Sequence, residues 1–290
     1  MVLLLHELKK NYGRKEALKG INLSLSPGIY GLLGPNGAGK STMMNILSCN
    51  LRQSSGTVTL DGEDIIAMGA AYRARLGYCP QQQALYPGFS GEQFLYYIAS
   101  LQGMKRKQAE QRIDWVLELL SMQDVRNNPI RSYSGGMKQR LLLAQSFLHD
   151  PDILILDEPT AGLDPRQRVV VRNLIGQIAL HKIVLISTHV VQDVDYIADE
   201  LILLSHGTVI GKGTPQSMLA RMKTRAWEIA VPESELPKTQ QLGTVCGIAR
   251  DKRGVCVRLL SPERPSPDCV PVTPTLEDMY LYHFGAEASV

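Results

Sequence analysis

Short apolar runs in the first two thirds of the chain predict the strands of a buried sheet. Residues 29–33, 152–157 and 182–187 are rich in Ile, Leu and Val, and polar or glycine residues bound them. Runs of this length are typical of parallel strands that are buried on both faces. Residues 21–26 alternate between apolar and polar positions, and residues 57–65 predict a hairpin-like pair of edge strands.

Between these strands the apolar spacing changes to that of helices. From residue 113 to residue 120, apolar side chains recur at i, i+3, i+4 and i+7, which places them on one face of a helix. The segment 134–149 continues with helical periodicity. The alternation of strands and helices predicts an α/β domain, with an all-helical subdomain at about residues 82–150.

The composition changes near Met222, where we predict a domain boundary. Seven of the 16 prolines lie in residues 221–290. This part contains predicted strands at residues 226–231, 244–249 and 254–260, a turn at Lys252, Arg253 and Gly254, and a closing helix at residues 276–284. We therefore predict a main domain over residues 1–221 and a small C-terminal α+β domain over residues 222–290. The alternative is a disordered tail, but the aromatic and β-branched content argues against it.

Charge, hydropathy and cysteine content exclude several classes of protein. The formal net charge is only +3, whereas nucleic-acid binding needs a concentrated basic surface. The longest apolar run, residues 94–99, is far shorter than the roughly 20 residues of a membrane span, and the apolar start of the chain is too short for a signal peptide. Five widely spaced cysteines without a C-x-x-C pair are typical of a reduced, cytoplasmic protein.

Residues 34–42 carry the strongest chemical signal in the chain. Their sequence, GPNGAGKST, fits the phosphate-binding pattern G-x-x-x-x-G-K-[ST] and lies between a predicted strand and a predicted helix. The glycines let backbone N–H groups turn toward a phosphate, Lys40 adds a positive charge, and the Ser41 hydroxyl can bind Mg²⁺. The predicted nucleotide-binding positions are Gly34, Pro35, Asn36, Gly37, Ala38, Gly39, Lys40, Ser41 and Thr42.

The apolar run at residues 152–157 ends in a pair of carboxylates, Asp157 and Glu158. The carboxyl edge of a parallel sheet is where α/β proteins bind ligands, so Asp157 is placed to hold Mg²⁺, directly or through water. Glu158 lies one residue further and is placed to take a proton from an attacking water. A solvated strand end is the alternative explanation for such a pair on its own.

Three further segments, in a fixed order, reveal a resemblance to a known family. YSGGMKQR at residues 133–140 lies between the two phosphate motifs, and AGLDP at 161–165 and STHV at 187–190 follow them. With these motifs, residues 1–220 resemble the nucleotide-binding subunit of ATP-binding cassette (ABC) transporters. The resemblance implies a P-loop NTPase fold of the ABC ATPase type. The signature segment departs from its commonest form at its variable ends, but its Ser-Gly-Gly core is intact.

The resemblance implies nucleotide contacts outside the phosphate loop. Ser134, Gly135 and Gly136 match the signature residues that grip the γ-phosphate bound to a second subunit, so each ATP site would be shared by two copies of the chain. Asp164 matches the loop aspartate that communicates between the two sites. Tyr12 matches the aromatic residue that stacks on adenine; a partly exposed strand tyrosine is the alternative explanation.

The resemblance also implies catalytic roles. Gln81 matches the loop glutamine that reaches the metal and the attacking water, although the adjacent Gln82 and Gln83 leave the register open. His189 matches the histidine that contacts the γ-phosphate, while a lone histidine after a strand is otherwise often structural. The implied catalytic residues are Lys40, Gln81, Glu158 and His189, and the implied Mg²⁺ ligands are Ser41, Gln81 and Asp157.

The function that the resemblance implies is an ATPase that powers transport. Because the chain has no predicted membrane span, we expect separate permease subunits and a peripheral position on the cytoplasmic face of the inner membrane. The SGGMKQR segment, the residues after STHV and the short C-terminal part with its PTLEDMYLYHFG ending resemble ABC-2 type exporters. The partners expected are a second copy of the chain and these membrane subunits, with ATP and Mg²⁺ as cofactors and no nucleic acid.

Several alternatives remain open. An importer ATPase or a soluble ABC ATPase, for example one in iron–sulfur assembly, would carry the same cassette. A DNA-repair type is disfavoured because the 93 residues between Lys40 and Ser134 show no sustained heptads. A non-hydrolysing binder would be expected to lack Glu158 or His189. The sequence names no transported substrate.

Overall fold

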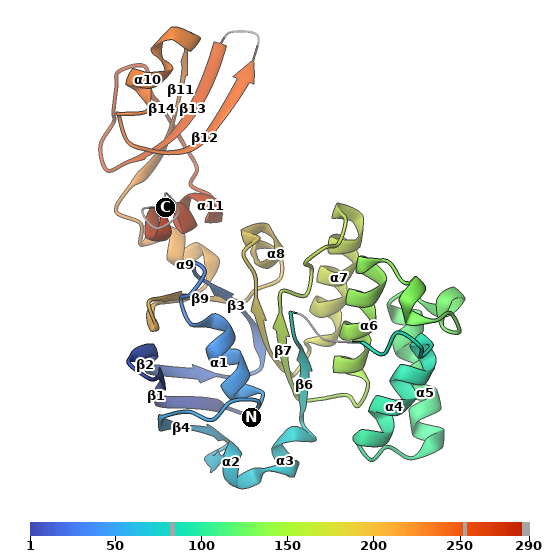
Figure 1. Ribbon diagram of the computed structural model, residues 1–290. Coiled ribbons are helices and arrows are strands. Elements are labelled where there is room, and N and C mark those ends of the chain that lie inside the picture. Colours follow the sequence, from blue (N-terminus) through green and yellow to red (C-terminus); the bar gives the residue numbers. More distant parts are fainter. Residues whose placement is uncertain (82–84, 252–253, 286–290) are drawn as a thin grey trace.

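The computed structural model describes residues 1–81, 85–251 and 254–285, which form three β-sheets and the helices around them (Figure 1). The central sheet has six strands, of which the outermost, β10, is antiparallel to its neighbour and the other five are parallel. In spatial order they are β10 (Thr208–Gly213), β9 (Glu200–Ser205), β3 (Gly28–Leu33), β8 (Ile183–Ser187), β7 (Ile153–Asp157) and β6 (Leu76–Cys79).

Both faces of the central strands are buried, which explains their continuous apolar sequences. Along β7, Leu154 and Leu156 face one core, while Ile153 and Ile155 face the other. The first core holds the side chains of the helices that precede and follow β7, and the second holds α1 (Lys40–Leu47) and the N-terminal sheet. Because successive side chains of a strand point to opposite faces, a strand between two cores must be apolar at every position.

The helical subdomain packs on the first core. It contains α4 (Gly91–Leu101), α5 (Arg106–Leu119), the short 3₁₀ helices η1 (Gln123–Val125) and η2 (Ile130–Ser132), and α6 (Gly135–Phe147). The helices predicted at residues 113–120 and 134–149 are therefore confirmed. After β7 come α7 (Pro165–Ile178), α8 (Val191–Asp195) and α9 (Pro215–Ala220).

The N-terminal sheet contains a strand that the apolar pattern did not predict. Its antiparallel order is β2 (Lys15–Leu25), β1 (Leu3–Tyr12), β4 (Ser55–Leu60) and β5 (Glu63–Asp64), followed by the short helices α2 (Ile65–Met68) and α3 (Ala70–Arg73). β1 was missed because its register shifts between Leu5 and Leu8, where Glu7 adopts a positive φ of 46°. The shift breaks the apolar alternation that would have revealed the strand.

The C-terminal residues form a third, antiparallel sheet in the order β12 (Thr244–Asp251), β13 (Gly254–Ser261), β11 (Arg225–Val231) and β14 (Val270–Val272). The short helices η3 (Glu233–Glu235) and α10 (Leu236–Thr239) follow β11, and α11 (Leu276–Phe284) ends the described chain. The sheet has a small core of its own around Trp227 and Val257. The predicted strands and closing helix are confirmed, while Lys252 and Arg253 of the predicted turn lie outside the described residues.

Two expectations concern the chain as a whole. Within the described residues, no helix combines the length and the apolar character that crossing a membrane requires. Among the described residues, which include all five cysteines, no disulfide is formed. The predicted α/β architecture with a helical subdomain is confirmed.

Candidate ATP site

The phosphate-binding loop connects the carboxyl end of β3 to the first turn of α1. Two glycines make its path possible. A Cβ atom on Gly34 would lie 2.1 Å from the backbone oxygen of Leu204, and Gly39 caps α1 with a positive φ of 109°. An L side chain would be strained in both places, so the pattern predicted from sequence corresponds to a real steric requirement.

Lys40, the first residue of α1, is partly buried beside the loop. Its Nζ donates hydrogen bonds to the carbonyl oxygens of Gly34, at 2.6 Å, and Pro35, at 3.0 Å. Burial lowers the pKa of Lys40, and the nearby carboxylates of Glu158 and Asp157 oppose that shift. The ammonium group is therefore surrounded by acceptors at the place where a nucleotide phosphate would add further negative charge.

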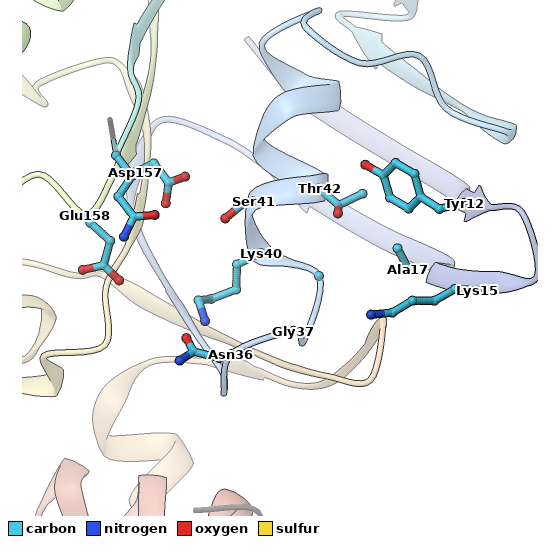
Figure 2. A pocket seen from close by; sticks show the side chains of 12 residues that line it. Tyr12, Lys15, Ala17, Asn36, Gly37, Lys40, Ser41, Thr42, Asp157 and Glu158 are labelled. Carbon is cyan, nitrogen blue, oxygen red and sulfur yellow. The ribbon is translucent and has the colours of Figure 1, made fainter. Parts of the chain in front are cut away.

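A cavity of about 420 Å³ joins the loop to residues from three other parts of the chain. In Figure 2, Tyr12 and Lys15 lie on one side of α1, Asp157 and Glu158 lie on the other, and Lys40 points into the space between. The residues that line the cavity are Tyr12, Lys15, Ala17, Asn36, Gly37, Gly39, Lys40, Ser41, Thr42, Gln81, Asp157 and Glu158. Predicted adenine, phosphate and metal positions thus share one cavity.

The two carboxylates are held at the end of β7 by the neighbouring strand β8. Ser187 Oγ donates a hydrogen bond to Asp157 Oδ1 and accepts one from the backbone N–H of Glu158 at 3.2 Å. Glu158 adopts a positive φ of 52°, which is uncommon for a residue with a long side chain. Strained backbone of this kind is concentrated at functional sites.

His189 lies next to Glu158. Its Nδ1 is 2.8 Å from Glu158 Oε2, although that oxygen is buried and accepts no well-directed hydrogen bond from the residues that the structure describes. The Glu158 side chain is 9% exposed, whereas that of His189 is 65% exposed. The pair therefore presents a buried carboxylate to the cavity and an imidazole to the surface beside it.

The signature residues lie elsewhere. Ser134 caps α6, where its Oγ accepts a hydrogen bond from the backbone N–H of Met137 at 3.2 Å, and Gly135 and Gly136 form the first turn. Asp164 caps α7 in the same way. Among the residues that the structure describes around the 420 Å³ cavity, these four are absent from the lining.

Gln81 lies where three cavities meet. It lines the nucleotide cavity, a second cavity of about 620 Å³ beside β6, and a third of about 410 Å³ that also includes Gly135. Gln82 and Gln83, the other candidates for this position, lie outside the described residues. Gln81 therefore lines both a cavity at the phosphate loop and a cavity at the helical subdomain.

Some site residues were not found from the sequence. Lys15 and Ala17 line the cavity from β2, and Ser187 orients both carboxylates from β8. Ser187 belongs to the STHV segment, so its motif was visible, but its hydrogen bonds depend on the pairing of two strands that are distant in sequence. No sequence motif includes Lys15, which is only close to Tyr12 in the sequence.

The donor set fits Mg²⁺. Ser41, Gln81 and Asp157 supply hydroxyl, amide and carboxylate oxygens around one end of the cavity, and hard cations prefer oxygen ligands. Across the described part of the chain, no group of three or more His, Cys, Asp and Glu residues forms a metal cluster. The arrangement is suited to an ion that completes its coordination with water and phosphate oxygens, as Mg²⁺ does.

Comparisons with known proteins agree with this geometry. Residues 18–161 match the ABC transporter family. The chain is 38% identical to a daunorubicin resistance ATP-binding protein of Streptomyces coeruleorubidus over 73% of this chain and 68% of that protein. It is 35% identical to the Nod factor export ATP-binding protein I of Paraburkholderia xenovorans over 74% of this chain and 71% of that protein.

A solved structure of the ATP-binding subunit of an ABC transporter superposes with a TM-score of 0.70 at 25% identity, covering 76% of this chain and 93% of the other. Fold, motif order and sequence similarity agree, and the family predicted from the motifs is confirmed. The chain belongs to the ATP-binding proteins of ABC transporters, a family of ATPases, and its relatives include subunits named for drug resistance and for export.

Proposed function

We propose that this chain binds ATP with Mg²⁺, hydrolyses it as a homodimer, and thereby powers the export of a substrate through separate membrane subunits. One observation carries the proposal: a single cavity joins an aromatic side chain, a phosphate-binding loop with its lysine, and a strained carboxylate paired with a histidine. The relatives named for resistance and export support the transport direction.

ATP fits the cavity in one orientation. Tyr12 is half exposed at one end, where its ring can stack on adenine, and Lys10 Nζ lies 5.3 Å from the ring centroid. The loop from Gly34 to Thr42 would hold the β- and γ-phosphates, with Lys40 as the positive charge between them. Because Asp157 and Glu158 lie on the other side of α1 from Tyr12 (Figure 2), the γ-phosphate would lie toward these two carboxylates.

Ser41, Gln81 and Asp157 are the proposed Mg²⁺ ligands. A divalent cation there would neutralise charge on the phosphate oxygens and orient the γ-phosphoryl group. Ser187 orients Asp157 through its hydroxyl. This second layer of hydrogen bonds restricts Asp157 to one orientation before the nucleotide arrives.

Glu158 is the proposed general base. Its carboxylate is buried at the γ-phosphate end of the cavity, and the backbone strain at this residue directs it there. His189 is placed to orient the attacking water and to contact the γ-phosphate. Lys40 stabilises charge on the transferred group. Together these residues position and polarise the reactants, which is most of what phosphoryl transfer requires from a protein.

The position of the signature residues supports a dimer. Ser134, Gly135 and Gly136 form a helix start, where backbone N–H groups favour an anion, yet they lie outside the lining of their own chain's nucleotide cavity. In a head-to-tail pair of copies, each signature would complete the partner's γ-phosphate site. Asp164, at the start of α7, would lie close to both sites.

The membrane subunits would bind near the helical subdomain. Tyr86, Phe89 and Tyr97 form an exposed aromatic cluster there, with ring centroids of neighbouring pairs 5.0 to 6.1 Å apart. We place the dimer on the cytoplasmic face of the inner membrane, held by those subunits. In the same proposal, residues 1–221 form the ATPase domain and residues 222–290 an accessory domain.

The proposal is tested by ATP turnover of the purified chain and of Glu158→Gln. The substitution keeps the shape of the side chain and removes its basicity, so kcat should fall about 100-fold or more while ATP binding persists. Glu118→Gln, an exposed glutamate on α5, is the matched control and should keep wild-type turnover. Equal rates for Glu158→Gln and wild type would contradict the assignment. Co-purification of an integral membrane subunit from native membranes tests the transport role separately.

A further inference from the structure

Helix α11, near the C-terminal end, is packed into the core of the ATPase rather than into the core of the C-terminal sheet. Leu276, Met279 and Phe284 are buried in the same cluster as Val191 and Val194 of α8. Figure 1 shows α11 between the C-terminal sheet and the rest of the molecule. The sheet is therefore joined to the ATPase through a helix whose apolar face contacts α8.

Polar contacts extend from α11 in both directions. Toward the ATPase, Gln192 Nε2 of α8 donates a hydrogen bond to Glu277 Oε1. Toward the C-terminal sheet, Arg258 of β13 donates hydrogen bonds to Asp278, with Nη2 2.7 Å from Oδ2. Arg258 also pairs with Glu228 of β11 at 2.9 Å. Adjacent residues of α11 thus connect two strands of the sheet to α8.

Helix α8 is in turn attached to the catalytic segment at two points. His189 lies two residues before its first turn and contacts Glu158. Asp193, in the middle of α8, accepts a hydrogen bond from Thr160 Oγ1, and both side chains are buried. Thr160 lies two residues after Glu158, so α8 is fixed to the chain segment that carries the proposed base.

We propose that α11 is a positioning element for His189: by holding α8 through Met279 and Glu277, the C-terminal unit determines where the imidazole lies relative to Glu158. The inference rests on the proposed function, because it assumes that His189 contributes to hydrolysis. Met279 and Glu277 touch neither nucleotide nor reacting atoms in this account, and they act only through α8.

The physical reason is that α8 is too short to fix its own position. It spans five residues, and its hydrogen-bonded interior cannot stabilise it without tertiary contacts. The His189 side chain is largely exposed, so its location depends on the backbone that follows it. Loosening the contact between α11 and α8 should displace the imidazole, and small displacements of a catalytic group lower the rate strongly.

The test compares two α11 variants with matched controls in the full-length chain. Glu277→Ala removes the acceptor of the Gln192 hydrogen bond, and Glu277→Gln restores an acceptor of the same shape. Met279→Ala truncates a buried α11 side chain in the core cluster that α11 shares with Val191 and Val194 of α8, whereas Val257→Ala truncates a buried side chain in the C-terminal sheet. Readouts are the proton NMR signal of the His189 imidazole, assigned with His189→Gln, together with kcat and the Kd for ATP.

We expect Glu277→Ala and Met279→Ala to shift the His189 signal and to lower kcat about threefold or more, the equivalent of roughly one net hydrogen bond, with little change in Kd. Glu277→Gln and Val257→Ala should keep the wild-type signal and rate. An unshifted His189 signal in both α11 variants would overturn the inference. A shifted signal with unchanged kcat would support the positioning and contradict instead the catalytic role of His189.

Discussion

His189 Nδ1 and Glu158 Oε2 are 2.8 Å apart, although the two residues follow different strands of the central sheet. The contact joins an exposed imidazole to a buried carboxylate that lines the 420 Å³ cavity. Glu158 adopts a positive φ of 52°, and Ser187 Oγ accepts a hydrogen bond from its backbone N–H, so the position of this residue is set by its own chain.

Replacing His189 should damage catalysis far more than binding. We expect His189→Ala to lower kcat about 100-fold, within the range for loss of a group that directs proton transfer, while the Kd for ATP changes about twofold or less. Steady-state ATPase assays and nucleotide titrations provide both values. His6→Ala, an exposed histidine on β1, serves as the control. A weaker ATP affinity at unchanged kcat would contradict the assigned role.

Replacing Ser187 should raise the Mg²⁺ concentration that ATP hydrolysis requires, because Ser187 orients the proposed Mg²⁺ ligand Asp157. Its hydroxyl donates to Asp157, so Ser187→Ala leaves the proposed Mg²⁺ ligand less well oriented. We expect the Mg²⁺ concentration for half-maximal ATPase activity to rise about tenfold, as for the loss of a residue that orients a metal ligand. Ser146→Ala, a buried serine bonded only within its own helix segment in the contacts described, should leave it unchanged. An identical Mg²⁺ dependence for wild type and Ser187→Ala would be incompatible with this arrangement.

Tyr12 should contribute to affinity through the face of its ring. Stacking on a base is worth about 1–3 kcal/mol, so Tyr12→Ala should weaken ATP binding by roughly 5- to 150-fold, and Tyr12→Trp should preserve it. Titration with a fluorescent ATP analogue measures both variants. The phenolic hydroxyl is dispensable in this account, so Tyr12→Phe should also bind normally. If Tyr12→Ala binds ATP as tightly as wild type, adenine lies elsewhere.

Much of the nucleotide site could be predicted because its motifs are local. The glycines of the phosphate loop lie within nine consecutive residues. The apolar sequence of β7 predicts a buried strand, and Asp157 and Glu158 stand at its carboxyl end. Contacts between distant segments left no such pattern. The bond of Asp193 to Thr160, the bond of Ser187 to Asp157 and the insertion of α11 against α8 depend on how strands and helices pack. Likewise, the bulge at Glu7 hid β1 by breaking the period on which strand prediction relies.

The pairing of Arg258 with Asp278 should make the C-terminal part sensitive to acid. Burial by itself raises the pKa of Asp278, but hydrogen bonds from Arg258 and Thr275 outweigh it, and the net shift is downward. A carboxyl with a lowered folded-state pKa stabilises the fold fully above its ordinary pKa of about 4, and the stabilisation is lost as the pH falls through the lowered value. Acidification below about pH 4 should therefore weaken the link between β13 and α11.

The corresponding variant is Arg258→Ala. Because the Asp278 side chain is 2% exposed, removing its partner at neutral pH should destabilise the C-terminal part by about 3–5 kcal/mol. Urea unfolding can be followed by the fluorescence of Trp227, which lies in this sheet, in a Trp115→Phe background. Arg250→Ala breaks an exposed pair with Glu233 and should cost about 1 kcal/mol or less. The prediction would be wrong if both arginine variants lowered the free energy of unfolding equally. It would also be wrong if the difference in unfolding free energy between wild type and Arg258→Ala persisted at low pH.

In the proposed dimer, two copies of this chain enclose ATP between the phosphate loop of one and the signature of the other. Sedimentation velocity of Glu158→Gln with ATP and Mg²⁺ tests it most directly, because this variant should bind ATP without cleaving it. We expect the 32.1 kDa chain to become a dimer with ATP, to return to a monomer when ATP is removed, and to stay a monomer with ATP when Ser134→Arg blocks the signature. A Glu158→Gln chain that is saturated with ATP yet remains a monomer at micromolar concentration, or a dimer that Ser134→Arg leaves intact, would contradict it.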